Sequence, residues 1–177
     1  MNYYIRIYIF TLFSFCLSGC LSRDRFIQNI SSGNQVQHEQ TLSGNGRILA
    51  YFIEEDQQQI IRIKDLRNGK IMRLRYLSRY KNHSSPSLSW NGRYIAVVTQ
   101  IGDKKTAVIE DLLGGRFYRI SNYAEGANPV SLSLSPEAKM IVILLESNQR
   151  KFLEFFDLTN RLQPDLLRGS APINYSP

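Results

Sequence analysis

Short apolar runs alternate with polar turn residues along most of the chain, and the runs have the length of strands rather than of helices. The pattern is clearest between residues 86 and 121, where pairs containing asparagine or glycine separate four such runs. The predicted strands are Pro86–Ser89, Tyr94–Thr99, Thr106–Asp111 and Phe117–Ser121. Turns this tight connect only antiparallel strands, so the segment is expected to form an antiparallel meander.

The same pattern recurs every 46 residues. An Asp-Leu pair marks the end of the third predicted strand in each copy, at Asp65-Leu66, Asp111-Leu112 and Asp157-Leu158. Without any gap, residues 42–74 and 88–120 agree at 11 of 33 positions, whereas composition alone gives about two. The third copy is weaker but keeps the apolar pattern. The chain therefore contains a true internal repeat.

A repeated four-stranded meander of this length is typical of the blades of a β-propeller. We therefore predict an all-β fold with antiparallel four-stranded propeller-type blades, three repeats of 46 residues in all, as a partial or half propeller. The repeats occupy residues 38–177, and the blades are expected at approximately 38–80, 83–124 and 127–170.

Three copies are fewer than the four to eight blades of most closed propellers. Residues 171–177 (APINYSP) look like the first strand of a fourth copy. Three explanations remain open: a homodimer that closes six blades, an open stack of three blades, or a truncated propeller. An open stack leaves sheet faces and edges exposed, which favours pairing or truncation.

The first twenty residues predict an exported protein. Ile7–Phe15 is an apolar run too short to span a bilayer but of the length found in signal peptides. The following Leu17-Ser18-Gly19-Cys20 resembles the bacterial lipobox. That resemblance implies that residues 1–19 are removed by a signal peptidase that recognises Leu17, Ser18 and Gly19. It also implies that Cys20 carries the lipid.

Residues 20–37 are then the lipidated cysteine and a polar tether, and the expected location is the bacterial cell envelope, facing the periplasm. Ordinary signal-peptidase cleavage and an uncleaved anchor remain alternatives. The formal charge of +7 comes from scattered Lys and Arg residues that alternate with apolar ones. A solvated sheet face gives that pattern, so nucleic acid is not expected as a partner.

The periodic polar residues are interpreted as structural. Asp65, Asp111 and Asp157 recur once per repeat, as expected of side chains that cap a turn. Asn45-Gly46 and Asn91-Gly92 are expected to form hairpin turns, because asparagine and glycine tolerate positive φ.

No catalytic residue, metal site or cofactor is predicted. His38 and His83 are the only histidines, and we expect both to be solvated loop residues. No serine lies in a G-x-S-x-G elbow, and the acidic residues lack the spacing of metal ligands. Trp90 is expected to pack between blades rather than to stack on a ligand.

The sequence motifs of the repeats resemble those of TolB-type propellers. LSGNGRILAYF, LSWNGRYIAVV and LSLSPEAKMIV resemble that family's SPDG-x-x-I-A element, and IKDLRNGK, IEDLLGGR and FFDLTNRL resemble its strand ending in aspartate. The resemblance covers about residues 36–170. Gly44-Asn45 and Trp90-Asn91 depart from it by replacing Pro-Asp, and Glu137-Ala138 departs from it by lacking the turn glycine.

This resemblance implies a non-enzymatic binding or scaffolding protein that contacts other envelope proteins through its blade loops or central mouth. The alternatives are an accessory propeller that gates or presents substrate to a separate hydrolase or transporter, and a truncated fragment.

Overall fold

The computed structural model describes residues 36–124 and 126–165, which form eleven strands and one 3-10 helix, η1 (Leu77–Arg79). The strands are β1 (Val36–Leu42), β2 (Ile48–Glu55), β3 (Gln58–Asp65), β4 (Ile71–Met72), β5 (Lys81–Leu88), β6 (Tyr94–Ile101), β7 (Lys104–Asp111), β8 (Arg116–Ile120), β9 (Asn128–Leu134), β10 (Met140–Ser147) and β11 (Arg150–Asp157).

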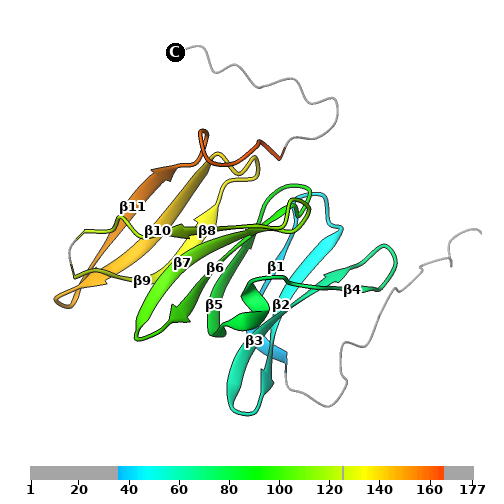
Figure 1. Ribbon diagram of the computed structural model, residues 1–177, viewed down its shortest axis with the longest axis horizontal. Coiled ribbons are helices and arrows are strands. Elements are labelled where there is room, and N and C mark those ends of the chain that lie inside the picture. Colours follow the sequence, from blue (N-terminus) through cyan, green and yellow to red (C-terminus); the bar gives the residue numbers. More distant parts are fainter. Residues whose placement is uncertain (1–35, 125, 166–177) are drawn as a thin grey trace, which may run out of the picture. The chain divides into compact units, whose positions relative to one another are not determined.

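The strands form three antiparallel sheets, one from each repeat, with the orders β1-β2-β3-β4, β5-β6-β7-β8 and β11-β10-β9 (Figure 1). Neighbouring strands in each sheet are consecutive in the chain, so each sheet is a meander. The predicted all-β class and the antiparallel propeller-type sheets are confirmed. We call the three sheets blade 1, blade 2 and blade 3.

Two apolar cores hold the blades together, one between blades 1 and 2 and the other between blades 2 and 3. Blade 2 is covered on both faces, and every residue from Tyr94 to Thr99 in β6 is buried. A single four-stranded sheet cannot bury its own faces, so each blade depends on its neighbours for a core.

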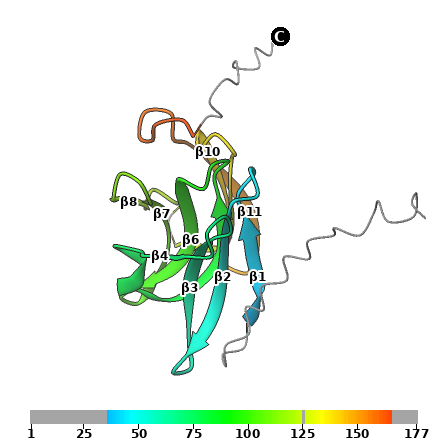
Figure 2. The same cartoon turned by 90° about the vertical axis from the view of Figure 1, so that its right-hand side faces the viewer.

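Serine side chains of β5 join the first strands of blades 2 and 3. The Ser85 hydroxyl lies 3.2 Å from the Leu132 carbonyl and accepts a 2.9 Å hydrogen bond from the Leu132 N–H. The Ser87 hydroxyl accepts one of 2.9 Å from the Leu134 N–H. The second view shows β1, β2 and β3 running alongside one another in blade 1 (Figure 2). The hydrogen bonds of Ser85 and Ser87 account for the serines at these two positions of β5.

Blade 3 differs from the prediction, because among the described residues it has three strands instead of four. Pro164 stands 46 residues after Tyr118, which pairs with Ile109 in blade 2. A proline has no N–H to donate to a sheet. The chain instead turns away, and the Asp165 N–H donates to the Glu137 carbonyl at 3.0 Å.

Strand β5 also differs, since it begins at Lys81 and not at Pro86. Its pairing with β6 shifts register between Lys81 and Ser84 and again between Ser84 and Ser87. Asn82 and Ser85 have positive φ values of 55° and 52°. These irregularities break the alternation of apolar and polar residues, which is why the sequence pattern misses the first half of the strand.

Candidate functional site

In each meander the first and third turns lie at the same end of the sheet. We call the surface formed by these turns in blades 1 and 2, residues 43–47, 66–70, 89–93 and 112–115, the turn surface. It contains Asn45, Gly46, Trp90, Asn91 and Gly92 of the residues that the sequence analysis singled out, and Asp65 and Asp111 directly precede two of its turns.

A serine fixes the first turn of every blade. The hydroxyls of Ser43, Ser89 and Ser135 accept hydrogen bonds from backbone N–H groups five residues further on, at 2.9, 3.0 and 3.0 Å. Ser43 and Ser89 are buried, so these bonds replace lost contacts with water. The serine of the repeated Leu-Ser pair therefore has a structural role that the sequence analysis did not assign.

The glycines of these turns have the expected backbone conformation, with φ of +71° at Gly46 and at Gly92. In blade 3 the corresponding residue is Ala138, which adopts the same left-handed region with φ of 58° and is buried. The loss of the glycine in the third copy therefore does not remove the turn.

The three periodic aspartates each close an Asx turn. Asp65, Asp111 and Asp157 accept hydrogen bonds from the N–H groups two residues further on, at 2.9, 3.1 and 2.8 Å. Asp65 and Asp111 are buried, whereas Asp157 is exposed.

Two of these aspartates also bind an arginine 18 residues earlier. Arg47 lies 2.7 Å from Asp65, and Arg93 lies 2.9 Å from Asp111. The hydrogen bond from Arg47 lowers the pKa of Asp65. Burial by itself raises the pKa of Asp111, but the hydrogen bonds from Arg93 and the Gly114 N–H outweigh it and lower the pKa. Both carboxylates are therefore charged at neutral pH and fix the turns of their blades.

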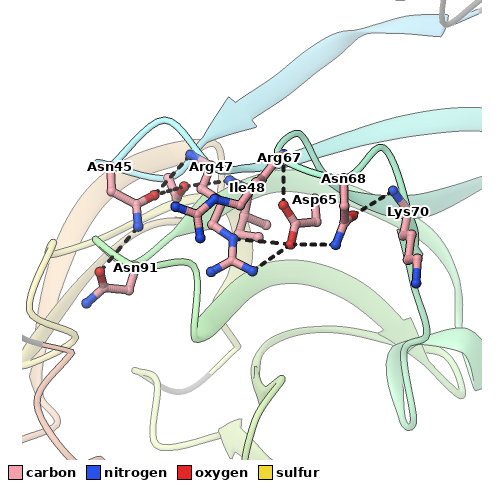
Figure 3. A network of polar contacts seen from close by, with 9 residues as sticks. Asn45, Arg47, Ile48, Asp65, Arg67, Asn68, Lys70 and Asn91 are labelled. Carbon is pink, nitrogen blue, oxygen red and sulfur yellow. Dashed lines mark hydrogen bonds and ion pairs between the residues drawn. The ribbon is translucent and has the colours of Figure 1, made fainter.

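Hydrogen bonds between blades join the turns into one surface. The Asn45 N–H donates to the Trp90 carbonyl at 3.0 Å, and the Trp90 N–H donates to the Pro136 carbonyl at 2.8 Å. The Asn45 side chain also donates to the Asn91 side chain of the next blade, at 3.2 Å (Figure 3). Figure 3 shows how this contact continues through Arg47 to Asp65. The predicted turn residues thus contact one another across a blade boundary.

The Trp90 ring lies against Gly44 of blade 1, so closely that a Cβ on Gly44 would overlap with the ring. This contact between the turns of two blades accounts for a glycine at position 44 and a tryptophan at position 90, and it agrees with the interpretation of Trp90 as a packing residue.

Asp165 completes the turn surface, although the sequence analysis did not single it out. Its buried carboxylate accepts a 2.6 Å hydrogen bond from the Ser89 hydroxyl and a 2.8 Å bond from the Asn91 N–H. Asp165 follows the third copy and has no counterpart in the first two, so periodicity carried no signal for it.

The exposed part of the turn surface is basic and concave. A groove of about 460 Å³ is lined by Asn45, Gly46, Arg47, Leu66 and Arg67. Arg67, which lines the groove, and Lys70, three residues further on, are both exposed. Within residues 36–124 and 126–165, no three His, Cys, Asp or Glu side chains lie together as a metal site would require. The groove offers hydrogen-bond donors and positive charge on a fixed backbone, which suits recognition of an acidic surface.

Glu110 of blade 2 holds the segment that connects blade 1 with blade 2, residues 73–80, against blade 2. Its buried carboxylate accepts hydrogen bonds from the N–H groups of Arg75 at 2.7 Å and of Leu77 at 2.8 Å, and from Tyr76 at 3.3 Å. These groups lie at the start of η1, where the backbone N–H groups have no partner within the helix. The sequence analysis did not find this role, because residues 75 and 110 are far apart in the chain.

His83 corrects a second expectation, since it is not a solvated loop residue. It lies in β5 and is only 1% exposed. Burial lowers its pKa from the ordinary 6.5 to about 4, although the carbonyls of Tyr80 and Leu77 act in the opposite direction. His83 is therefore neutral at pH 7. His38 is not a loop residue either, because it lies in β1, and its side chain is outside the described part of the structure.

The folded chain is expected to lose stability as the pH falls from 6.5 towards 4. Below pH 6.5 the unfolded chain takes up a proton at His83 that the folded chain binds only near its pKa of about 4. The difference corresponds to a loss of about 3 kcal/mol. Urea unfolding between pH 7 and pH 4 measures it, and a His83→Gln variant should lack this part of the pH dependence. An equal pH dependence in both proteins would contradict the assignment.

The N-terminal predictions lie outside the described residues. These are the signal peptide, the recognition residues Leu17, Ser18 and Gly19, and the lipidated Cys20. Among the described residues, no helix has the length and apolar character needed to cross a membrane.

No protein-family model and no curated protein matches the sequence. Solved structures do match the fold. TolB from Acinetobacter baumannii aligns over 74% of this chain and 32% of its own length, with a TM-score of 0.58 and 16% identity. Putative TolB from Agrobacterium tumefaciens aligns over 73% of this chain and 47% of its own, with a TM-score of 0.53 and 18% identity.

The β-propeller domain of the Trilobed protease from Pyrococcus furiosus is also similar, over 75% of this chain and 42% of its own, with a TM-score of 0.55 and 16% identity. The chain therefore spans less than half the length of each of these proteins. At these identities the likeness shows the fold alone. The described residues have the fold of part of a TolB-like β-propeller.

Proposed function

We propose that this chain is a non-catalytic, protein-binding propeller of the bacterial cell envelope, which holds the turn surface towards other envelope proteins. The observation that carries the proposal is the cross-blade network of the turn surface on a TolB-like fold. Propellers of this kind act in general as protein-binding scaffolds.

The turn surface suits binding because its backbone is fixed in advance. The Asp–Arg pairs fix the turns within blades 1 and 2, and the hydrogen bonds from Asn45 to Trp90 and from Trp90 to Pro136 hold turns of all three blades together. A surface that is already ordered loses little conformational entropy on binding. Exposed Arg67 and Lys70 then favour a partner with an acidic surface.

We propose no reaction at this site. Arg47 and Arg93 pair with Asp65 and Asp111 and hold turns, and no charged side chain of the turn surface forms a nucleophile–base pair of the kind that covalent catalysis uses. On the lipoprotein resemblance, Cys20 would carry the anchor, and the segment between it and β1, residues 21–35, would separate the propeller from the membrane.

An accessory role beside a separate hydrolase or transporter is the second candidate. The similarity to the propeller domain of the Trilobed protease favours it, since that protein joins a propeller to a protease. A crosslinked partner with hydrolase activity would support this role instead of a scaffold.

Site-specific photo-crosslinking in living bacteria tests the proposal. A photo-reactive residue replaces Arg67 on the turn surface of the full-length chain, and it replaces Lys104 in the matched control. Lys104 is also basic and exposed, but it lies in the hairpin between β6 and β7, at the opposite end of the sheets. We expect discrete crosslinked products from position 67, absent at position 104.

Two further variants complete the experiment. With the probe at Leu113, which also lies on the turn surface, the wild-type chain should give the same product. The Arg67→Glu, Lys70→Glu variant with that probe should lose it, because it reverses the charge that attracts the partner. Cys20→Ala should move the protein from the membrane fraction to the soluble fraction. Equal products at positions 67 and 104 would contradict the role of the turn surface, and unchanged membrane association would contradict the anchor.

A further inference from the structure

A cavity of about 520 Å³ lies between β3, β4, η1 and β5, where blade 1 continues into blade 2. Cavities of this volume are typical of sites that bind small molecules. We call it the inter-blade cavity. It shares no lining residue with the groove of the turn surface, so it is a feature separate from the proposed function.

The inter-blade cavity exists because the chain leaves the edge of blade 1 early. In blade 2 the fourth strand pairs with β7 over five positions, and Ile120 stands opposite Ala107. In blade 1 the short strand β4 pairs with β3 only at Ile63 and Lys64. Leu74, the counterpart of Ile120, has no partner in β3. The edge of β3 is therefore open beside the cavity.

Glu110 holds the connecting segment in this position. Its carboxylate accepts hydrogen bonds from the N–H groups of residues 75–77 and so keeps the segment on blade 2. The segment consequently cannot continue along β3 as β8 continues along β7. Buried hydrogen bonds, and not loose packing, keep the cavity open.

A side chain that closes the corresponding edge of blade 2 has no equivalent in blade 1. The Tyr123 hydroxyl accepts a 2.8 Å hydrogen bond from the Ala107 N–H. The counterparts of these residues 46 positions earlier are Leu77 and Ile61, and both line the cavity. Leucine has no hydroxyl and cannot accept this bond. The polar contact of blade 2 is thus replaced by an apolar wall.

Most of the cavity wall is apolar. Its apolar residues are Ile60, Ile61, Ile71, Met72, Leu74 and Leu77. Ile61, Leu74 and Leu77 are at most 7% exposed, so they form the inner part of the wall. An apolar group of a ligand gains free energy on such a wall because its surface is removed from water.

His83 also lines the inner part of the cavity. It is 1% exposed, and its Nδ1 atom has no hydrogen-bond partner within residues 36–124 and 126–165. Most buried polar atoms of proteins do have a partner, so an unpaired one indicates a place for a bound molecule. A nitrogen of a neutral imidazole either donates or accepts one hydrogen bond. Nδ1 therefore suits a hydroxyl group, which can do both.

Arg73 brings positive charge to the mouth of the cavity. It is exposed, and it forms no ion pair in the part of the chain that the structure describes. Arg62, the other basic residue of the wall, is paired with Glu55 at 2.7 Å. No acidic side chain is among the described residues that line the cavity. An unpaired guanidinium group beside an apolar wall favours a carboxylate.

We propose that the inter-blade cavity binds a small amphipathic hydroxy acid. The carboxylate pairs with Arg73 at the mouth, the apolar chain packs against the isoleucine and leucine wall, and the hydroxyl group forms a hydrogen bond with Nδ1 of His83. This site goes beyond the proposed function, because its ligand is a small molecule and not a protein.

Octanoate and ω-hydroxyoctanoate are the probes, because they differ only by a hydroxyl group at the end remote from the carboxylate. Each is titrated into the purified full-length protein, and the resonances of the protein are followed by NMR. We expect both probes to shift the amide resonances of Ile61 and Leu77. The hydroxy acid alone should also shift the Nδ1 resonance of His83.

Two arginine variants test the contact with the carboxylate. Arg73→Gln should raise the dissociation constant of both probes about tenfold, because a hydrogen bond between charged groups is lost. Arg79→Gln is the matched control, since Arg79 is exposed in the same connecting segment but does not line the cavity. The control should leave both constants within about twofold of those of the wild-type protein.

A His83→Phe variant tests the contact with the hydroxyl group. The wild-type protein should bind ω-hydroxyoctanoate at least as tightly as octanoate. The variant should bind the hydroxy acid about tenfold more weakly than octanoate, because the buried hydroxyl is then without a partner. Octanoate binding by the variant also shows that it is folded. If the variant does not fold, the comparison of the two probes in the wild-type protein decides.

Three results would overturn the proposal. They are no shift of Ile61 or Leu77 at saturating octanoate, equal dissociation constants in Arg73→Gln and Arg79→Gln, and a hydroxyl group that weakens binding to the wild-type protein about tenfold. Shifts confined to Leu153 and Phe155, which are exposed on blade 3, would place the acid elsewhere and count with the first. The crosslinking at position 67 does not depend on this cavity, so either proposal can fail without the other.

Discussion

Replacing Glu110 by alanine is expected to lower the free energy of unfolding by roughly 3 kcal/mol or more. The carboxylate accepts hydrogen bonds from the N–H groups of Arg75, Tyr76 and Leu77, and it is 1% exposed. Alanine leaves these donors without their acceptor and opens a cavity between the connection and blade 2. Each buried donor left unsatisfied costs about 1–3 kcal/mol.

Urea unfolding of residues 21–177, followed by the fluorescence of Trp90, measures this loss. Glu154→Ala is the matched control, because Glu154 is half-buried and makes one hydrogen bond, of 3.2 Å, with the Ala124 N–H. We expect the control to lose at most about 1 kcal/mol. Similar losses in the two variants would show that Glu110 does not hold the connection.

The second large effect is expected from Gly92→Ala. Gly92 has φ of +71°, and a Cβ at this position would lie 2.5 Å from a side-chain carbon of Ile48 in blade 1. Ile48 is buried in the core between blades 1 and 2, so it has no free space into which to move. We expect a loss of about 3 kcal/mol, from overpacking together with the cost of positive φ.

Gly46→Ala separates these two causes. Gly46 occupies the same position of the repeat, with the same φ of +71°, but no atom lies within 4 Å of its added Cβ. Only the cost of the left-handed conformation remains, about 1 kcal/mol. Ala138 shows that alanine is accepted at this position in blade 3. Equal losses at positions 46 and 92 in thermal unfolding would contradict the close contact with Ile48.

Periodicity explains which parts of the fold were predictable. The turns at Asn45-Gly46 and Asn91-Gly92, and the strands that they join, depend on residues near in sequence and repeated every 46 positions. Local patterns of this kind report local structure directly. The same periodicity indicated that the aspartates are turn residues and not catalytic groups, and their hydrogen bonds are those of Asx turns.

The sequence pattern misses what occurs only once. Glu110 and Asp165 each form hydrogen bonds with residues more than 30 positions away, and neither role is repeated in another blade. His83 stands among polar neighbours, and only the packing around β5 buries it. Among the described residues, blade 3 has no fourth strand, and the effect of Pro164 on this strand appears only when the copies are compared position by position.

The features of the proposed binding surface divide in the same way, into those that the repeat pattern predicted and those that it missed. The turn residues were predictable one by one, but their contact across the blade boundary was not. Asn45 meets Trp90 and Asn91 only because consecutive blades stack with their turns in line. The stack therefore converts three sets of local turns into one surface, on which the proposed function depends.

Hydrogen–deuterium exchange at the Asn45 and Trp90 amides tests that stack most directly. Both N–H groups lie in turns, and their acceptors belong to the next blade, the carbonyls of Trp90 and Pro136 at 3.0 and 2.8 Å. If the three blades stack as described, both amides exchange at least about 100-fold more slowly than in an unstructured peptide. Exchange at the unstructured rate in both turns, with the strands still protected, would show that the blades fold without stacking and would contradict the account.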